Sequence, residues 1–204
     1  ISRSTLFGSL DQNKMQWMIE IAAVLAFSAT QNHDKVGMIL FSDKIHLYIP
    51  PKKGRQHILR MIRELIVTRS DAGRTRFDLP LQYLDSVQTK KTICFLLSDF
   101  HDPIPESTLK IVSRRHDVIG LQILDPLEKS MKSVGLIQLK DAESGNELLI
   151  DTSDKQWMEQ YSATQQKHYT QLRQFFSRAN ADFLQLDLDD SYIKVLLNFF
   201  KKRH

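Results

Sequence analysis

Four oxygen-bearing side chains, at three places in the chain, are of the types that bind a hard divalent cation. Ser2 and Ser4 stand two residues apart in an N-terminal segment of loop composition. Thr75 lies in a polar loop, and Asp99 follows the apolar run Thr92–Leu97. Mg²⁺ prefers oxygen ligands in octahedral geometry and keeps several waters, so a few hydroxyls and one carboxylate are sufficient protein ligands. These residues therefore predict a metal site if the fold brings their loops together.

Other site chemistries lack the residues that they need. The seven glycines are scattered singly, and neither GxxxxGK[ST] nor GxGxxG occurs, which argues against a phosphate-binding loop. A single cysteine, Cys94, is too few for a structural zinc cluster, and no GxSxG sequence marks a serine nucleophile. The net charge is only +4, and no basic stripe is interleaved with aromatic residues, so nucleic-acid binding is not predicted.

Simpler roles for the same residues stay open at this point. Thr75 is also a residue that caps turns, and Asp99 one that caps the segment after a strand. An enzyme is the second functional hypothesis: a metal-dependent hydrolase or phosphotransfer enzyme with Asp99 as ligand or nucleophile. Asp43 and Asp125 would then join the same edge, because each also follows an apolar run. Their simpler role is turn formation.

The elements that position these residues alternate between strand and helix. Apolar runs predict strands at Val36–Phe41, Ile45–Ile49, Thr92–Leu97, His116–Leu124 and Ala181–Leu186. Helical spacing predicts helices at Lys14–Ala29, Gln56–Val67, Leu79–Val87, Glu106–Ser113, Lys155–Arg178 and Ser191–Lys201. Two alternating runs within 134–150 flank a turn and predict a β-hairpin. This order predicts an α/β fold with a doubly wound, mainly parallel sheet.

Length and composition predict one soluble domain over residues 1–204. A lone cysteine cannot form an intrachain disulfide, which favours a reducing compartment. No apolar run reaches the roughly 18 residues of a membrane span, and no signal peptide is recognisable. We therefore expect a cytoplasmic location, with no membrane contact within this segment. Because the sequence opens on Ile1, we also expect it to be part of a longer protein.

Several long stretches carry a family resemblance, in the same order along the chain. They are SRSTLFGS, IAAVLAFSATQNHDKVGMILFSD, YIPPKKGRQHILRMIRELI, FLLSDF, RRHDVIGLQILDP and GLIQLKDAESG. With them the chain resembles the von Willebrand factor A-like domain of bacterial proteins associated with MoxR-type ATPases, known as domain-of-unknown-function family 58. The resemblance implies a Rossmann-like sheet with a metal-dependent adhesion site at its carboxyl edge.

The resemblance also implies roles for individual residues. Ser2 and Ser4 match the serines of a DxSxS motif, Thr75 the threonine of a later loop, and Asp99 the aspartate after a central strand. The leading Asp of DxSxS would fall immediately before Ile1, together with the first strand, so that strand is missing from the chain. The implied function is a non-enzymatic protein-binding module that uses Mg²⁺ or Mn²⁺. Its implied partners are an acidic side chain of another protein and a MoxR-type AAA+ ATPase, in assembly or activation of other proteins.

Overall fold

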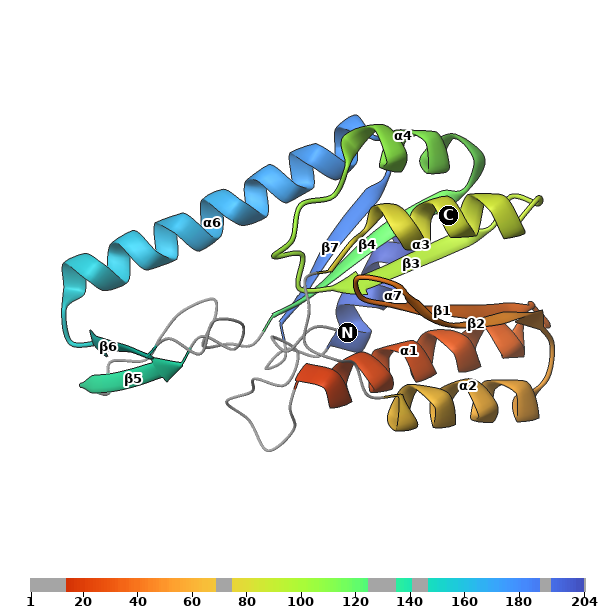
Figure 1. The fold of residues 1–204 in the computed structure, drawn as a ribbon, viewed down its shortest axis with the longest axis horizontal. Helices are drawn as coiled ribbons and strands as arrows, with labels where there is room; N and C mark the ends of the chain where they lie inside the picture. The colour runs from red at the N-terminus through yellow and green to blue at the C-terminus, as the bar shows by residue number, and fades with distance from the viewer. Residues whose placement is uncertain (1–13, 69–74, 125–134, 141–146, 188–191, 204) are drawn as a thin grey trace.

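The fold combines a parallel sheet, two antiparallel strand pairs and helices (Figure 1). The computed structural model describes residues 14–68, 75–124, 135–140, 147–187 and 192–203. Its helices are α1 (Lys14–Gln31), α2 (Arg55–Val67), α3 (Asp78–Val87), α4 (Glu106–Arg115), α6 (Lys155–Arg178) and α7 (Tyr192–Arg203). Its strands are β1 (Val36–Phe41), β2 (Ile45–Lys52), β3 (Ile93–Ser98), β4 (Asp117–Leu124), β5 (Leu136–Lys140), β6 (Glu147–Asp151) and β7 (Asp182–Asp187).

The centre of the molecule is a three-stranded parallel sheet in the order β3–β4–β7. Parallel strands need crossover connections, and α4 and α6 lie in the connections between these strands. Because all three strands run the same way, their carboxyl ends meet at one edge of the sheet. The predicted mixed α/β class with parallel strands is thus confirmed.

Helices cover both faces of this sheet, as the side-chain alternation along β4 shows. Val118 belongs to a buried cluster that includes Leu109 of α4 and Phe176 of α6. Ile119 belongs to a second buried cluster, with Ile21 of α1 and residues of α7. Successive side chains of a strand point to opposite faces, so these two clusters are the two halves of a doubly covered core.

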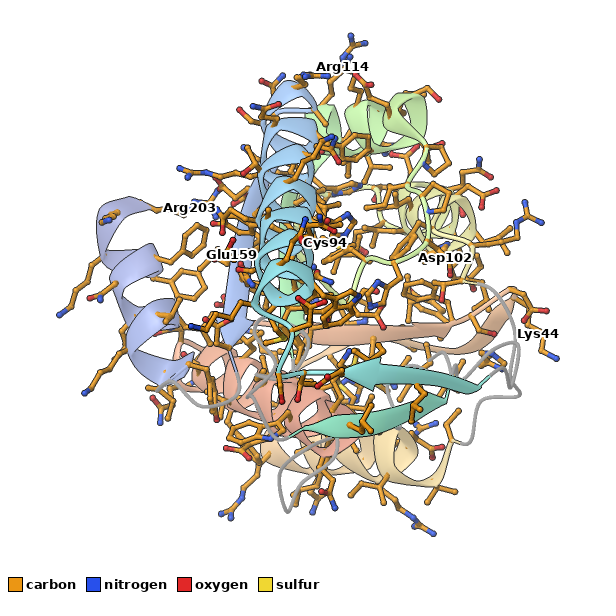
Figure 2. All side chains as sticks on the ribbon, turned by 90° about the vertical axis from the view of Figure 1, so that its left-hand side faces the viewer. Lys44, Cys94, Asp102, Arg114, Glu159 and Arg203 are labelled. Atoms are coloured by element: carbon orange, nitrogen blue, oxygen red, sulfur yellow. The ribbon has the colours of Figure 1, made fainter. Side chains whose placement is uncertain are left out.

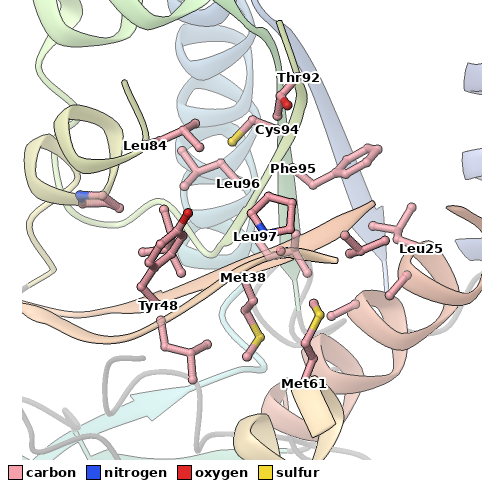
Figure 3. Close-up of a pocket in the computed structure, with 18 of the residues that line it drawn as sticks. Leu25, Met38, Tyr48, Met61, Leu84, Thr92, Cys94, Phe95, Leu96 and Leu97 are labelled. Carbon is pink, nitrogen blue, oxygen red and sulfur yellow. The ribbon is translucent and has the colours of Figure 1, made fainter. Parts of the chain in front are cut away.

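β1 and β2 form a separate antiparallel pair. The sequence predicted the second strand as Ile45–Ile49, but β2 continues through Pro50 and Pro51 to Lys52. Among the described residues β2 pairs with β1 alone, so its other side is an edge, where proline's missing N–H costs no ladder bond. A mainly apolar cavity of about 580 Å³ lies between this pair and β3, with α1 and α2 contributing to its walls (Figure 3).

The predicted hairpin is present as β5 and β6, which pair antiparallel; its turn lies outside the described residues. α6 follows directly and extends away from the sheet with the hairpin at its far end (Figure 1). The Asp154 carboxylate caps α6 by accepting from the backbone N–H groups of Gln156 and Trp157. At the other end Gly120 lets the Phe176 ring approach, because a Cβ there would stand 2.7 Å from that ring. The helix is thereby anchored at its C-terminal end.

Candidate functional site

Two of the four predicted metal ligands are described by the structure, and both lie at the carboxyl edge of the sheet. Asp99 follows β3 directly, and Thr75 lies just before α3. Ser2 and Ser4 lie outside the described residues, so their predicted role is untested. Asp125, part of the enzyme hypothesis, also lies outside the described residues. The described site therefore consists of Asp99, Thr75 and their neighbours.

Asp99 is held in a buried turn at the end of β3. The residue is 5% exposed. The Phe100 backbone N–H donates to the Ser98 hydroxyl at 3.1 Å, and Phe100 itself has a φ of 57°. Such a left-handed conformation costs a non-glycine residue roughly 1–2 kcal/mol. The Phe100 ring is buried against Phe77, at a centroid distance of 5.6 Å, and against other aromatic rings, which offsets that cost. Aromatic packing therefore fixes the turn that bears Asp99.

The segment around Thr75 joins the ends of two strands. The Thr75 backbone N–H donates to Oδ2 of Asp102 at 2.7 Å, three residues after Asp99. The next residue, Arg76, donates its backbone N–H to the carbonyl oxygen of Ser42, which follows β1. The loops after β1 and β3 are thus drawn together through Thr75 and Arg76. Thr75 and Asp99 thus lie in loops that are joined by this hydrogen bond, and their role as metal ligands stays a prediction.

A lysine that the sequence pattern did not single out lies beside Asp99. Lys14, the first residue of α1, places its Nζ 3.9 Å from Oδ2 of Asp99, and its side chain is fully buried. Other groups near the carboxylate are the Ser98 hydroxyl, at 3.4 Å from Oδ1, and Nε2 of His101, at 4.0 Å from Oδ2. The Asp99 carboxylate therefore has a buried cationic neighbour, but at the outer limit of an ion pair.

A second residue missed by the sequence pattern is Gln122, in the middle of the apolar strand β4. It pairs with Ser98 in the sheet register and is 2% exposed. Its Nε2 donates to the backbone carbonyl of Asp99 at 3.0 Å. Its Oε1 is buried and has no hydrogen-bond partner among the described residues. A buried acceptor oxygen without a donor is costly, and an ordered water or a bound ion is among the groups that can satisfy it.

The other carboxylates near this edge are engaged locally. Arg76 binds Asp78 through both Nε, at 3.3 Å, and Nη2, at 2.7 Å, and this hydrogen bonding holds the pKa of Asp78 below its usual value. The Ser42 hydroxyl donates to Asp43 at 2.8 Å and is the main cause of that carboxyl's lowered pKa. Both carboxyls are thus engaged by neighbours, and both are more exposed than Asp99.

The donor set fits a hard cation better than a soft one. Asp99, Thr75 and Gln122 offer carboxylate, hydroxyl and amide oxygens, the ligand types of Mg²⁺ and Mn²⁺. Within the described part of the chain no group of three His, Cys, Asp or Glu side chains is placed to hold a metal. We refer to Lys14, Thr75, Asp99, Asp102 and Gln122 as the strand-end cluster.

Sequence comparisons find bacterial relatives over all or most of the chain. It is 24% identical over 208 residues to the uncharacterized protein Rv1480 of Mycobacterium tuberculosis, which covers all of this chain and 65% of that protein. It is 25% identical over 160 residues to the uncharacterized protein MAV169 of Mycobacterium avium, covering 76% of this chain and 93% of that protein. The chain thus spans about 65% of the length of the longer relative.

Among solved structures, the chain is similar to an aerotolerance-related membrane protein from Bacteroides fragilis, with a TM-score of 0.63 and 15% identity. The match covers 98% of this chain and 94% of that one, so the two share a fold. Of the helices in the described part of the chain, none combines the length and apolar character needed to cross a membrane. The sequence profile described as "protein of unknown function DUF58" matches residues 1–171. The chain therefore belongs to the DUF58 family.

Proposed function

We propose that this chain is a cation-dependent protein-binding module, in which Ser2, Ser4, Thr75 and Asp99 hold Mg²⁺ or Mn²⁺. The observation that supports this most is Asp99, a buried carboxylate at the carboxyl edge of a parallel sheet. Ligand sites of open α/β sheets collect at this edge. When bound, the cation supplies a positive charge with an open coordination position, which attracts a carboxylate of a partner protein.

Contacts within the chain hold the proposed oxygen donors in place before a cation binds. The Phe100 turn fixes Asp99, and Asp102 fixes the loop of Thr75 by accepting its backbone N–H. Gln122 anchors the Asp99 backbone from the neighbouring strand and leaves Oε1 as a further buried acceptor. These contacts limit motion of the oxygen donors, so binding requires little rearrangement of the described loops.

The finer fold that we propose is a von Willebrand factor A-like, Rossmann-like sheet with one more central strand. Among the described residues β1 pairs only with β2, and β3 only with β4, so each has an edge without a strand neighbour. The cavity between them is lined by Met38 of β1 and by Cys94 and Leu96 of β3 (Figure 3). An additional apolar strand there would complete both hydrogen-bonding edges. The von Willebrand factor A-like resemblance implies such a strand in that position.

Partners and location follow from the same resemblance. We propose that the module works beside a MoxR-type AAA+ ATPase in assembly or activation of other proteins, and that it faces the cytoplasm. A protein partner would present an acidic side chain to the site. The structural neighbour is described as a membrane protein, so a module of this kind is compatible with a membrane-attached parent protein.

The test compares cation binding by the full-length protein with that of two isosteric variants. Titration calorimetry with MgCl₂ or MnCl₂ should detect binding by the wild type and by Asp117→Asn, whose carboxylate lies at the other end of β4. Asp99→Asn, shown by circular dichroism to be folded, should lose the binding signal. Equal binding by all three proteins, or none by the wild type, would refute the metal assignment.

The enzyme hypothesis is separated by a second assay on the same proteins. Phosphatase and phosphodiesterase substrates should give no turnover that depends on Asp99. Turnover by the wild type that disappears in folded Asp99→Asn would favour the hydrolase or phosphotransfer hypothesis instead.

A further inference from the structure

His168, in the second half of α6, contacts the turn that bears Asp99. Its imidazole hydrogen-bonds to the backbone of Phe100, and its ring stacks on that of His101 with the two centroids 6.4 Å apart. The hydrogen bond favours the protonated imidazole and so acts against burial, the main cause of the lowered pKa of His168. Such an effect requires that the ring donates and that the Phe100 carbonyl accepts. Nε2 is buried without a partner among the described residues, so the donor is Nδ1.

The turn at Asp99 and Phe100 is therefore held through two successive carbonyl groups. The Asp99 carbonyl accepts from Nε2 of Gln122 on β4, at 3.0 Å. The Phe100 carbonyl accepts from His168 on α6. Phe100 has a φ of 57°, a left-handed conformation that persists in a non-glycine residue only where the surroundings hold it. Loss of one of these anchors thus lets the turn relax towards an ordinary backbone conformation, which displaces the Asp99 carboxylate.

His168 lies where α6 leaves the core. After it, Leu172, Phe175 and Phe176 pack in the buried cluster that also contains residues of α4. Before it, no described residue of α6 belongs to either buried cluster, and the helix extends towards the β5–β6 hairpin (Figure 1). His168 therefore connects the beginning of the projecting part of α6 to the loop after β3.

We propose that His168 is a positioning residue for the cation site, on which it acts through the Phe100 carbonyl. This inference rests on the proposed function, since it concerns how the same site is held. Mg²⁺ demands near-ideal octahedral geometry with ligands at about 2.0–2.1 Å, so a small displacement of the Asp99 carboxylate weakens binding. Residues that orient a metal ligand without touching the metal typically contribute about 10-fold to 100-fold to the affinity. Because His168 belongs to α6, the position of this helix then contributes to cation affinity.

Calorimetry with MgCl₂ on the full-length protein tests the inference with two variants of His168. His168→Phe keeps a ring to stack on His101 but removes the donor, and should raise the dissociation constant by about ten-fold or more. His168→Asn supplies an amide N–H near the position of Nδ1, and should restore most of the affinity. An unchanged affinity in His168→Phe would overturn the inference and leave the proposed function intact. Equal weakening by the two variants would also overturn it, since the donated hydrogen bond would not be the cause.

His57 provides a matched control in another part of the fold. Its Nε2 lies 2.9 Å from the carbonyl oxygen of Val36, the first residue of β1. His57→Phe therefore also removes a hydrogen bond between a histidine ring and a backbone carbonyl, but its Mg²⁺ affinity should equal that of the wild type. A loss as large as that of His168→Phe would show that general destabilisation weakens binding, and would overturn the inference.

A second measurement needs no variant and does not depend on His168→Phe folding. NMR spectra that correlate the ring protons and nitrogens of histidine are recorded for the full-length wild-type protein with and without saturating Mg²⁺. Binding should shift the ring signals of His168 and leave those of His57 unchanged. Unshifted His168 signals under conditions where calorimetry shows bound Mg²⁺ would overturn the inference. Absence of Mg²⁺ binding by the wild type would overturn both the inference and the proposed function.

Discussion

Acidic residues lie at both ends of the parallel sheet, but their exposure and the distance to their cationic partners differ between the two ends. At the amino end Asp117 begins β4 and Asp182 begins β7, and Arg203 contacts them at 2.6 and 2.9 Å. These side chains are 28% to 45% exposed. At the carboxyl end Asp99 is buried and its lysine neighbour is 3.9 Å away. Figure 2 shows Arg203 and Asp102, near the two ends, on opposite sides of α6.

This difference in exposure and contact distance bears on the role of each end, stability or ligand binding. Partly solvated pairs with short contacts bring modest stability at little desolvation cost. A buried pair with a long contact bears the full desolvation cost and recovers less of it, and apolar residues of similar size often stabilise such a position better. The short, partly solvated contacts of the amino end are those of a stabilising surface pair. For the carboxyl end, binding of a ligand at the strand-end cluster is the explanation that we favour.

The largest effect on stability is expected from breaking the buried pair from one side. Asp99→Asn leaves the Lys14 ammonium buried beside a neutral amide, and should lower the free energy of unfolding by about 3 kcal/mol, as for other buried pairs that lose one partner. Combining it with Lys14→Met should restore most of that loss. Urea denaturation followed by circular dichroism measures both. A cost below about 1 kcal/mol for Asp99→Asn would mean that the pair is effectively solvated.

A smaller effect is expected at the amino end. Arg203→Met removes contacts to Asp117 and Asp182 and a stacking contact in which the guanidinium carbon lies 5.2 Å from the centre of the Phe199 ring. Because these groups are partly solvated, the expected cost is about 1 kcal/mol. The same urea experiment in NaCl at about 1 M should reduce this cost through screening, but should leave the Lys14–Asp99 coupling nearly unchanged. If salt reduced the Lys14–Asp99 coupling as much as the cost of Arg203→Met, the carboxyl-end pair would be as solvated as the amino-end one, contrary to the account.

Acidification should remove stability at both ends of the sheet, through a histidine at each end whose pKa is lowered by burial. Burial lowers the pKa of His116, beside Asp117, with Arg115 adding to the shift and Asp85 opposing it. Since the unfolded chain then binds the proton more readily, His116 contributes stability that is present above its unfolded pKa near 6.5 and is lost as the pH falls. His116→Gln should therefore flatten part of the loss of stability between about pH 7 and pH 5. The urea midpoint at each pH provides the measurement.

His168, on α6, is the matching case near the carboxyl end. Burial is the main cause of its lowered pKa, and the ring of His101 stacks on it at 6.4 Å. His168→Gln should flatten the same window by a separate, additive amount, because the two histidines lie in different parts of the fold. If neither variant alters the dependence of the urea midpoint on pH, protonation of these two histidines is not a cause of the protein's loss of stability in acid, and the prediction is wrong.

Much of the fold was predictable because its signals are local. The β1 strand Val36–Phe41 and the α6 helix Lys155–Arg178 have the predicted bounds, since apolar run length and helical spacing depend only on neighbouring residues. The position of Asp99 at a strand end was predictable for the same reason. β2 was predicted too short, because its passage through two prolines depends on being an edge strand.

The strand-end cluster was only partly predictable because its contacts span long sequence separations. Lys14 and Asp99 are far apart in the chain, and a lysine at the start of a helix has a solvated role by default. The faint signals were a lysine, Lys14, next to the apolar pattern of a buried helix and a glutamine, Gln122, inside an apolar strand. Neither residue type identifies its partner: the Gln122 contact follows from the parallel register of β3 and β4, and the Lys14 contact from the packing of α1 against the sheet.

The most direct measurement of the central claim uses Mn²⁺ as a paramagnetic probe in amide NMR spectra of the full-length protein. Substoichiometric Mn²⁺ should broaden the backbone signals of Thr75, Phe100 and His101 and the side-chain amide signals of Gln122. The backbone signals of Asp117, at the opposite end of β4, should stay sharp. Broadening of Asp117 as strong as that of Phe100, or no broadening of Phe100 at all, would contradict a cation site at the carboxyl end of the sheet.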